Sequence, residues 1–178
     1  MKKTAQKKQQ SSLTATTFFQ YSKCPAWPWH EAFSDSKNRA KVSALTEKLW
    51  ADGLLHEHEM VALRGKKQEI VEVPHEGDLD ERALQTAGLM KQGKPLIYHG
   101  VLTHGTWVGI PDLLEKVDGK SELGEHFYVA CDIKRTKHLD DVHKLQLFFY
   151  SELLKRVQGR RPERGYIIDA QGEVQDFV

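Results

Sequence analysis

The sequence has few cysteines, no long apolar run and almost no net charge, and each shortage excludes a class of protein. Its two cysteines, Cys24 and Cys131, are too few for a zinc ribbon or an iron–sulfur cluster held by one chain. They also argue against a disulfide framework and favour a reducing, cytoplasmic setting. No apolar stretch approaches the ~20 residues that span a bilayer, so we expect no membrane partner. The formal net charge of +1 gives no global field that would indicate a nucleic-acid-binding protein.

Chain length limits the number of domains. At 178 residues the chain can bury one sizeable hydrophobic core but is too short for two comfortable domains. Residues 1–15 begin with a basic, Gln-rich and Ser-rich segment, which we expect to be a disordered tail. This segment is not followed by an apolar stretch, so we do not interpret it as a signal peptide. Residues 16–178 are expected to form a single domain.

Hydrophobic periodicity predicts an α/β domain with a central mixed sheet. Helical spacing covers residues 39–63, 79–91 and 139–157, with Asp78 as a plausible N-cap and Gly93 as a plausible stop of the second helix. Strand patterns occur in "KQEIVEVP", "PLIYHGVL", "TWVGIPDLLEKV", "HFYVACDIK" and "GYIIDA". From the second helix onward the order is helix, three meandering strands, helix, strand (αβββαβ). The aromatic segment "FFQYSKCPAWPWHEAF" is expected to form a turn or short helix folded against the domain.

A D-x-K sequence ends one of the predicted buried strands. Residues two apart in a strand point to the same face, so Asp132 and Lys134 share one face while Ile133 points into the opposite layer. Asp112 lies in the preceding strand, and adjacent antiparallel strands are only ~5 Å apart, so a suitable register would bring the two aspartates together. Oxygen-rich sites of this kind suit Mg²⁺ or Mn²⁺.

Two interpretations of this pattern remain open from spacing alone. In the first, Asp132 holds a metal ion, and Lys134 orients or deprotonates a metal-bound water or neutralises charge on a phosphate. In the second, the two residues form a surface ion pair on an edge strand. A D-x-K sequence is short and common, so the pattern by itself favours the second interpretation.

Other polar residues add to the first interpretation. Gln146 and Tyr150 are four apart in the long helix and so lie on one face, beside an otherwise apolar stripe. Tyr150 could equally be a core residue with a satisfied hydroxyl, and Gln146 a solvated residue at the edge of the stripe. In "GLLHEHEM", His56 and His58 diverge on a helix, so only one of them could join the two aspartates at a metal.

Taken in order, several segments carry a family likeness. They are "YSKCPAWPW", "GLLHE", "TAGLMKQGKPLIYHGVL", "GIPDLL", "CDIK" and "LQLFFYSELLKRVQGRRP". Together they resemble the PD-(D/E)XK nuclease superfamily, specifically its RecB-like branch and the putative RecB-family nucleases. The likeness extends from about Phe19 to Ile168. It implies a restriction-endonuclease-like core in which helices flank the central mixed sheet.

The likeness also implies roles for individual residues. Asp112, Asp132 and Lys134 would be catalytic. A Mg²⁺ or Mn²⁺ ion would be bound by His56, the two aspartates and the Ile133 carbonyl, with Glu57, His58 and Glu59 outside the coordination sphere or facing solvent. The substrate side would be formed by Gln146, Tyr150 and the basic residues Arg135 and Lys137.

Substrate and partners follow from the same likeness. It implies hydrolysis of DNA phosphodiester bonds in repair, recombination or defence, with a helicase or an RNase-H-like module as partner, and the chain could be part of a longer protein. The alternative is a catalytically weak nucleic-acid-binding module that serves such a partner. Some relatives hold an iron–sulfur cluster, but no cysteine trio follows Tyr150, so no cluster is expected and Cys24 is interpreted as a packing residue.

Aromatic residues and a second basic tract are further candidates for substrate contact. Trp27, Trp29 and Trp107 could stack on single-stranded bases, although core packing is the favoured interpretation for each. The cluster Arg160–Arg164 could bind flanking phosphates, in which case affinity would fall steeply with salt.

Overall fold

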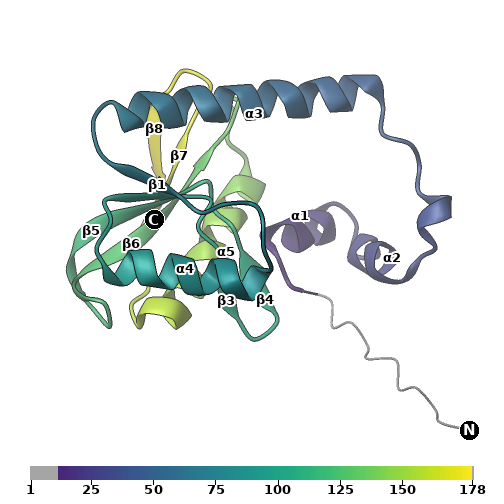
Figure 1. The fold of residues 1–178 in the computed structure, drawn as a ribbon. Helices are drawn as coiled ribbons and strands as arrows, with labels where there is room; N and C mark the ends of the chain where they lie inside the picture. The colour runs from purple at the N-terminus through teal and green to yellow at the C-terminus, as the bar shows by residue number, and fades with distance from the viewer. Residues whose placement is uncertain (1–11, 178) are drawn as a thin grey trace, which may run out of the picture.

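A six-stranded mixed β-sheet forms the centre of the computed structural model, which describes residues 12–177 (Figure 1). The strands lie in the order β1-β2-β5-β6-β7-β8. Their bounds are Ile70–Glu72 (β1), Leu96–Tyr98 (β2), Leu113–Ser121 (β5), Gly124–Ile133 (β6), Gly165–Ile168 (β7) and Val174–Phe177 (β8). The pairs β1–β2 and β6–β7 are parallel and the others antiparallel. The expected α/β class with a mixed sheet flanked by helices is therefore confirmed.

Helices cover both faces of this sheet. The helix α3 (Ala44–Gly65) packs on one face, where Met60 and Val61 contact the cluster that contains Cys131 and Ile133. The helices α4 (Leu79–Lys91) and α5 (Asp141–Gln158) contribute to the opposite layer, together with Ala130 of β6. Successive residues of β6 therefore alternate between two apolar layers, as the period of a strand requires.

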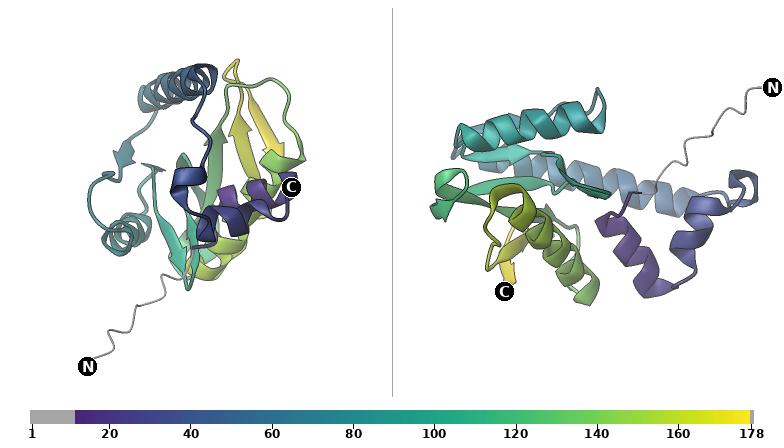
Figure 2. Two further views of the ribbon diagram at one scale, coloured as in Figure 1. Left: turned by 90° about the vertical axis from the view of Figure 1, so that its right-hand side faces the viewer. Right: turned by 90° about the horizontal axis from the view of Figure 1, so that it is seen from below.

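The helix α3 extends well beyond the sheet. It has 22 residues, begins after the N-cap Ser43 and continues through Gly53, which the pattern allowed as a break. Its N-terminal half projects past the strands on the side of α1 and α2 (Figures 1 and 2). Leu45 and Leu49 in this half are 68% and 56% exposed, whereas His56 is the first buried residue along the helix. Only the C-terminal half of α3 is thus anchored on the sheet.

The aromatic N-terminal segment forms the helices α1 (Ala15–Lys23) and α2 (Trp27–Phe33), followed by the short 3₁₀ turn η1 (Ser36–Asn38). Phe18 of α1 packs against Phe149 of α5, with ring centroids 5.4 Å apart. In contrast, Trp29 is 58% exposed, and Cys24 is exposed as well. The expectation of packing against the domain is confirmed for α1 but wrong for Trp29 and Cys24.

The start of the domain lies slightly before the predicted boundary. Residues 1–11, most of the expected tail, lie outside the described residues. Leu13, assigned to that tail, pairs with the strand β4 (Trp107–Gly109) through backbone hydrogen bonds to Thr106 and Val108. Thr14 then caps α1 by accepting a hydrogen bond from the backbone of Thr17.

Two predicted strands are each divided in the structure. "PLIYHGVL" forms β2 and the separate strand β3 (Leu102–His104), because His99 adopts a left-handed conformation (φ 54°) that ends β2. "TWVGIPDLLEKV" forms β4 and β5, with Pro111 between them. The strands β3 and β4 pair as a two-stranded ribbon outside the main sheet. The final strand β8 was not predicted.

The helices α4 and α5 follow their predicted positions closely. The helix α4 has the predicted bounds, and Asp78 caps it by accepting a hydrogen bond from the backbone N–H of Glu81 at 2.8 Å. The helix α5 begins two residues later than predicted, because Asp140 caps it instead. Among the helices of residues 12–177, none is sufficiently long and apolar to cross a membrane.

Candidate functional site

The register of the hairpin β5–β6 brings Asp112 and Asp132 side by side. Leu113 pairs with Cys131, so the residues just before and just after this pair, Asp112 and Asp132, lie opposite one another. Oδ2 of Asp112 also accepts a hydrogen bond from the backbone N–H of Ile133 at 2.6 Å. The side chain of Ile133 packs in the other layer. The sequence-based expectation that a hairpin would bring these residues together therefore matches the observed geometry.

Asp132 is a buried carboxylate with little to satisfy it. The residue is only 1% exposed, and no group among residues 12–177 donates a well-directed hydrogen bond to either of its side-chain oxygens. Nζ of Lys134 lies 2.8 Å from Oδ2 and forms an ion pair with it. A buried carboxylate ordinarily accepts several hydrogen bonds, because removing its charge from water is costly. Lys134 shares Oδ2, so Asp132 keeps acceptor positions, above all at Oδ1, for a further ligand.

The charges of the site perturb one another. Burial raises the pKa of Asp112 well above its usual value, and the neighbouring Asp132 raises it further, against the opposing effects of Lys134 and the Ile133 N–H. Burial alone would lower the pKa of Lys134, but Asp132 and Asp112 raise it overall. Lys134 therefore remains an ammonium ion at neutral pH. One ammonium faces two acidic side chains, so the site has an excess of acidic groups that would attract a cation.

Gln146 and Tyr150 lie on the face of α5 that is turned toward these charges. Nε2 of Gln146 donates to the Tyr150 hydroxyl at 3.1 Å, and this hydroxyl donates to the carbonyl oxygen of Ile110 at 3.3 Å. Burial raises the pKa of Tyr150 well above its usual value, and the charge of Asp132 adds to the effect. Tyr150 therefore carries a neutral hydroxyl close to the aspartates, and the partly exposed Gln146 donates a hydrogen bond to it.

A cavity of about 270 Å³ opens beside Lys134, between α1 and the start of α5. Its wall includes Lys134, Gln146 and His143, and also Phe18 and Phe19 of α1. An ammonium group, an amide and aromatic rings thus line one concave surface. Such a surface can bind a ligand that combines negative charge with a flat ring.

The two histidines of α3 are placed very differently. His56 is buried, with Nε2 3.1 Å from the carbonyl oxygen of Asp169, whereas His58 is exposed. The residue between them, Glu57, is not turned to solvent as one expectation had it. Its Oε1 accepts hydrogen bonds from the Tyr98 hydroxyl and from Nε2 of His99, each at 2.8 Å.

Glu57 also acts on the aspartate site. Burial would raise the pKa of Glu57, but the hydrogen bonds from His99 and Tyr98 lower it overall, so it is ionised at neutral pH. Its charge contributes to the raised pKa values of Asp112 and Lys134. Sequence reasoning missed Glu57, Tyr98 and His99. The only signal was the position of Glu57 beside His56 on the predicted helix.

The predicted basic residues differ in whether their charged groups already contact other residues of the protein. Arg135 forms an ion pair with Asp52 at 2.8 Å, whereas Lys137 is exposed. Arg160 is used structurally at the other end of α5, where it donates to the Lys120 carbonyl and lies 3.9 Å from the Phe127 ring centroid. Of these three, Lys137 is exposed and forms no ion pair among the residues that the structure describes.

The tryptophans also separate into two groups. Trp107 is stacked on Phe149, with centroids 5.1 Å apart and planes 5° apart, and the guanidinium of Arg156 covers it. The favoured interpretation of core packing is therefore confirmed for Trp107. Trp27 and Trp29 are 40% and 58% exposed, so the same interpretation is wrong for these two.

No protein-family model and no curated protein matches this chain. The chemistry of the site is therefore the guide to function. Two adjacent carboxylates, one of them buried with only a neighbouring ammonium group as its partner, form a site that fits a hard divalent cation.

Proposed function

We propose that this protein is a Mg²⁺- or Mn²⁺-dependent deoxyribonuclease with a restriction-endonuclease-like core of the RecB-like type. The observation that carries the proposal is the state of Asp132. This buried carboxylate lies opposite Asp112, and the Lys134 ammonium, 2.8 Å from Oδ2, is its single polar partner among the described residues. A buried carboxylate with so few partners is costly, and a second cation at its remaining acceptor positions would offset part of that cost.

The oxygen donors of the site fit the ion that the family likeness implies. Asp112, Asp132 and the carbonyl oxygen of Ile133 would hold the ion. The likeness adds His56 of α3, but Nε2 of His56 lies 3.1 Å from the carbonyl oxygen of Asp169. Among residues 12–177, the side-chain donors of His56, Asp112 and Asp132 do not all lie within 4.8 Å of one another. Asp132 and Ile133 end β6, and Asp112 directly precedes β5. When bound, the ion supplies Lewis-acid polarisation of the scissile phosphate and lowers the pKa of a water molecule.

The protein's own groups would perform the remaining tasks. Lys134 carries a proton at neutral pH, so we assign it the role of a hydrogen-bond donor that orients the attacking water and stabilises charge developing on the phosphate. Gln146 supports this role because it lines the same cavity as Lys134. The exposed Lys137 would bind a flanking phosphate.

Cleavage of labelled DNA tests the proposal. The full chain would be incubated with Mn²⁺ and with Mg²⁺ on single-stranded and duplex substrates, beside Asp132→Asn and the control Asp118→Asn, which changes an exposed aspartate of β5. We expect ion-dependent cleavage that falls at least about 100-fold in Asp132→Asn and is unchanged in Asp118→Asn.

Two results would contradict the proposal. Equal cleavage by the wild type and Asp132→Asn would show that the activity comes from another site or another protein. Binding of DNA by the wild type with no cleavage in either ion would instead identify a nucleic-acid-binding module that lacks the chemistry. An anisotropy measurement on the same substrates distinguishes this second result from failure to bind.

A further inference from the structure

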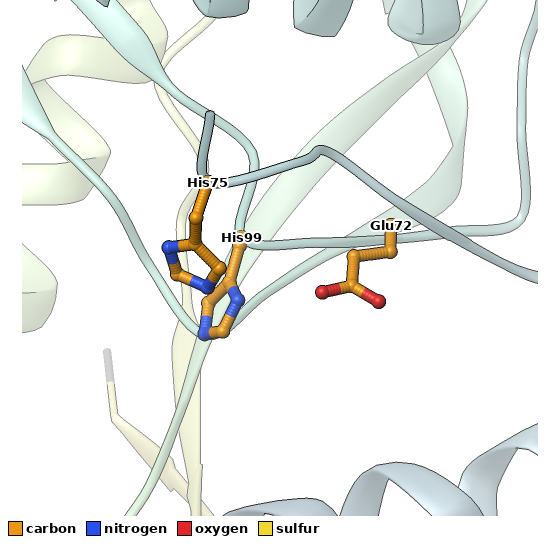
Figure 3. A group of neighbouring side chains, drawn as sticks. All are labelled: Glu72, His75 and His99. Carbon is orange, nitrogen blue, oxygen red and sulfur yellow. The ribbon is translucent and has the colours of Figure 1, made fainter. Parts of the chain in front are cut away.

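A second group of potential metal ligands lies beside the aspartate site. Glu72 is the last residue of β1, His75 follows it in the loop, and His99 comes directly after β2. The strands β1 and β2 are parallel, and Glu72 pairs with Tyr98, so the two strands finish side by side at the same end of the sheet. One donor atom from each of the three residues lies within 4.8 Å of the others. In Figure 3 the two rings and the carboxylate point toward one another.

The backbone of His99 has an unusual conformation, and aromatic rings pack on its side chain. It is the only non-glycine residue with a positive φ (54°) among residues 12–177. A non-glycine residue in this region is strained, and such strain persists only where the surroundings enforce it. Here the ring of Tyr98 stacks on His99 with centroids 3.7 Å apart, and the ring of His75 meets it edge-on at 4.4 Å.

The hydrogen bonding of His99 leaves one ring nitrogen available. Nε2 is 2.8 Å from Oε1 of Glu57, whereas Nδ1 is buried and has no hydrogen-bond partner in the described part of the chain. A carboxylate beside Nε2 favours the tautomer with a proton there, which leaves the lone pair on Nδ1. Histidines that bind metals are commonly oriented by a carboxylate in this way.

The geometry points to a divalent transition-metal site formed by Glu72, His75 and His99, of the class that takes Zn²⁺ or Co²⁺. Two imidazoles and one carboxylate suit these ions, whereas Mg²⁺ prefers oxygen ligands. Donor atoms bound at about 2.0–2.2 Å lie roughly 3–4 Å apart, so small side-chain rotations would close the observed spacing. Glu72 and His75 are exposed, so an ion here would keep a coordination position open to solvent.

This site is separate from the aspartate site but adjoins it. The backbone N–H of His99 donates to the carbonyl oxygen of Asp112 at 3.1 Å, and Glu57 links His99 to the charges of the aspartate site. The two sites differ in donor chemistry, because one offers oxygens and the other is rich in nitrogen. The inference does not depend on the proposed nuclease activity.

Metal titration with a spectroscopic readout tests the inference. The full chain, without a polyhistidine tag and freed of metal by a chelator, would be titrated with Co²⁺ and then with Zn²⁺ in competition. Visible absorption of Co²⁺ reports its ligands, and ¹⁵N-edited spectra report the histidine rings. With excess Mg²⁺ present to occupy the aspartate site, we expect one bound Co²⁺ that Zn²⁺ displaces. The ring signals of His75 and His99 should be shifted in the diamagnetic Zn²⁺ form.

Variants assign the ion to one of the two sites. We expect His75→Ala and Glu72→Gln each to weaken Co²⁺ binding at least tenfold. The control His104→Ala removes an exposed histidine of β3, and Asp132→Asn alters the other site, so neither should change the affinity. Wild-type affinity in His75→Ala, or loss of binding in Asp132→Asn alone, would overturn the inference. Circular dichroism would verify that each variant is folded.

Discussion

The carboxylate of Asp112 joins the beginning of β5 to the end of β6, because its Oδ2 accepts a hydrogen bond from the backbone N–H of Ile133 at 2.6 Å. The same carboxylate faces Asp132 across the hairpin. One side chain thus fixes the position of two strand ends and also contributes to a concentration of negative charge. These two effects oppose each other in the stability of the metal-free protein.

We predict that Asp112→Asn stabilises the metal-free protein at neutral pH. The raised pKa of Asp112 means that the folded state binds a proton more tightly than the unfolded state, so wild-type stability falls as pH rises through the raised value. Asparagine can still accept the bond from Ile133 but carries no charge. Each pKa unit corresponds to about 1.4 kcal/mol, and about 1 kcal/mol changes Tm by roughly 2–4 °C in a domain of this size.

Thermal unfolding in a chelator between about pH 4 and pH 8 measures this effect. The advantage of Asp112→Asn over the wild type should be largest at the alkaline end and should shrink toward the usual pKa of a carboxyl group. Asp118→Asn, which alters an exposed aspartate, serves as the control. A variant that is less stable than the wild type at pH 8 would show that the charge of Asp112 is satisfied without a cation.

Lys134→Ala is expected to reduce the rate of DNA cleavage about 100- to 1,000-fold with little effect on DNA affinity, because an ammonium group that acts in the transition state contributes mainly to kcat. Lys134 keeps its proton at neutral pH, so deprotonation of this lysine should not lower the wild-type rate between about pH 6 and pH 9. Single-turnover kinetics at several DNA concentrations and pH values measures the cleavage rate, the DNA affinity and the pH dependence of the rate. Lys144→Ala, which removes an exposed lysine paired with Asp141, is the matched control. Unchanged turnover in Lys134→Ala would remove this residue from the mechanism.

Phe19→Ala is expected to weaken binding of single-stranded DNA by about 1–3 kcal/mol, because base stacking on an aromatic ring contributes this much. Phe19 is 40% exposed and lines the cavity that contains Lys134 and Gln146. Fluorescence anisotropy in the Asp132→Asn background would measure affinity without cleavage. Phe33→Ala, which removes a more exposed ring outside this cavity, should bind normally. Equal losses in both variants would indicate a general effect of the N-terminal helices.

Gln158→Ala is expected to destabilise the fold by about 2–4 kcal/mol, because it leaves buried backbone groups without partners. Gln158 is fully buried, and its side-chain amide makes the pair of hydrogen bonds with β6 that the backbone of a neighbouring strand would make. Its Oε1 accepts from the Tyr128 N–H at 2.8 Å, and its Nε2 donates to the Tyr128 carbonyl at 3.0 Å. The β6–β7 pairing begins only at Cys131, so β7 does not provide these bonds.

Urea unfolding of the metal-free protein would measure the Gln158→Ala effect. The slope with denaturant should be unchanged while the midpoint falls. Gln92→Ala, at an exposed position after α4, is the matched control and should stay within about 0.5 kcal/mol of the wild type. A similarly small effect of Gln158→Ala would mean that water replaces the amide at Tyr128.

The parts of the fold that depend on local pattern were predictable from the sequence. The helix α4 and its cap Asp78 follow from helical spacing and from the capping preference of aspartate. The proximity of Asp112 and Asp132 was also accessible, because the side-chain period of two and a plausible hairpin register place both on one face.

Other features depend on contacts between distant segments. The left-handed turn at His99, which divides a predicted strand, is stabilised by Tyr98, Glu57 and His75, and no local pattern indicates it. Because the turn was not predicted, neither the inward position of Glu57 nor the group around His99 could be derived. The short edge strand β8 was missed for a related reason, since it gains its order by pairing with β7.

The uneven support of α3 has a consequence for how the molecule opens. A continuous helix of 22 residues is held by the sheet only from about His56 onward, while the leucines before that point face solvent. Local opening should therefore require much less free energy near Leu45 than near Met60. Amide hydrogens along this one helix would then exchange over a wide range of rates, slowest in the turns that carry His56 and Glu57.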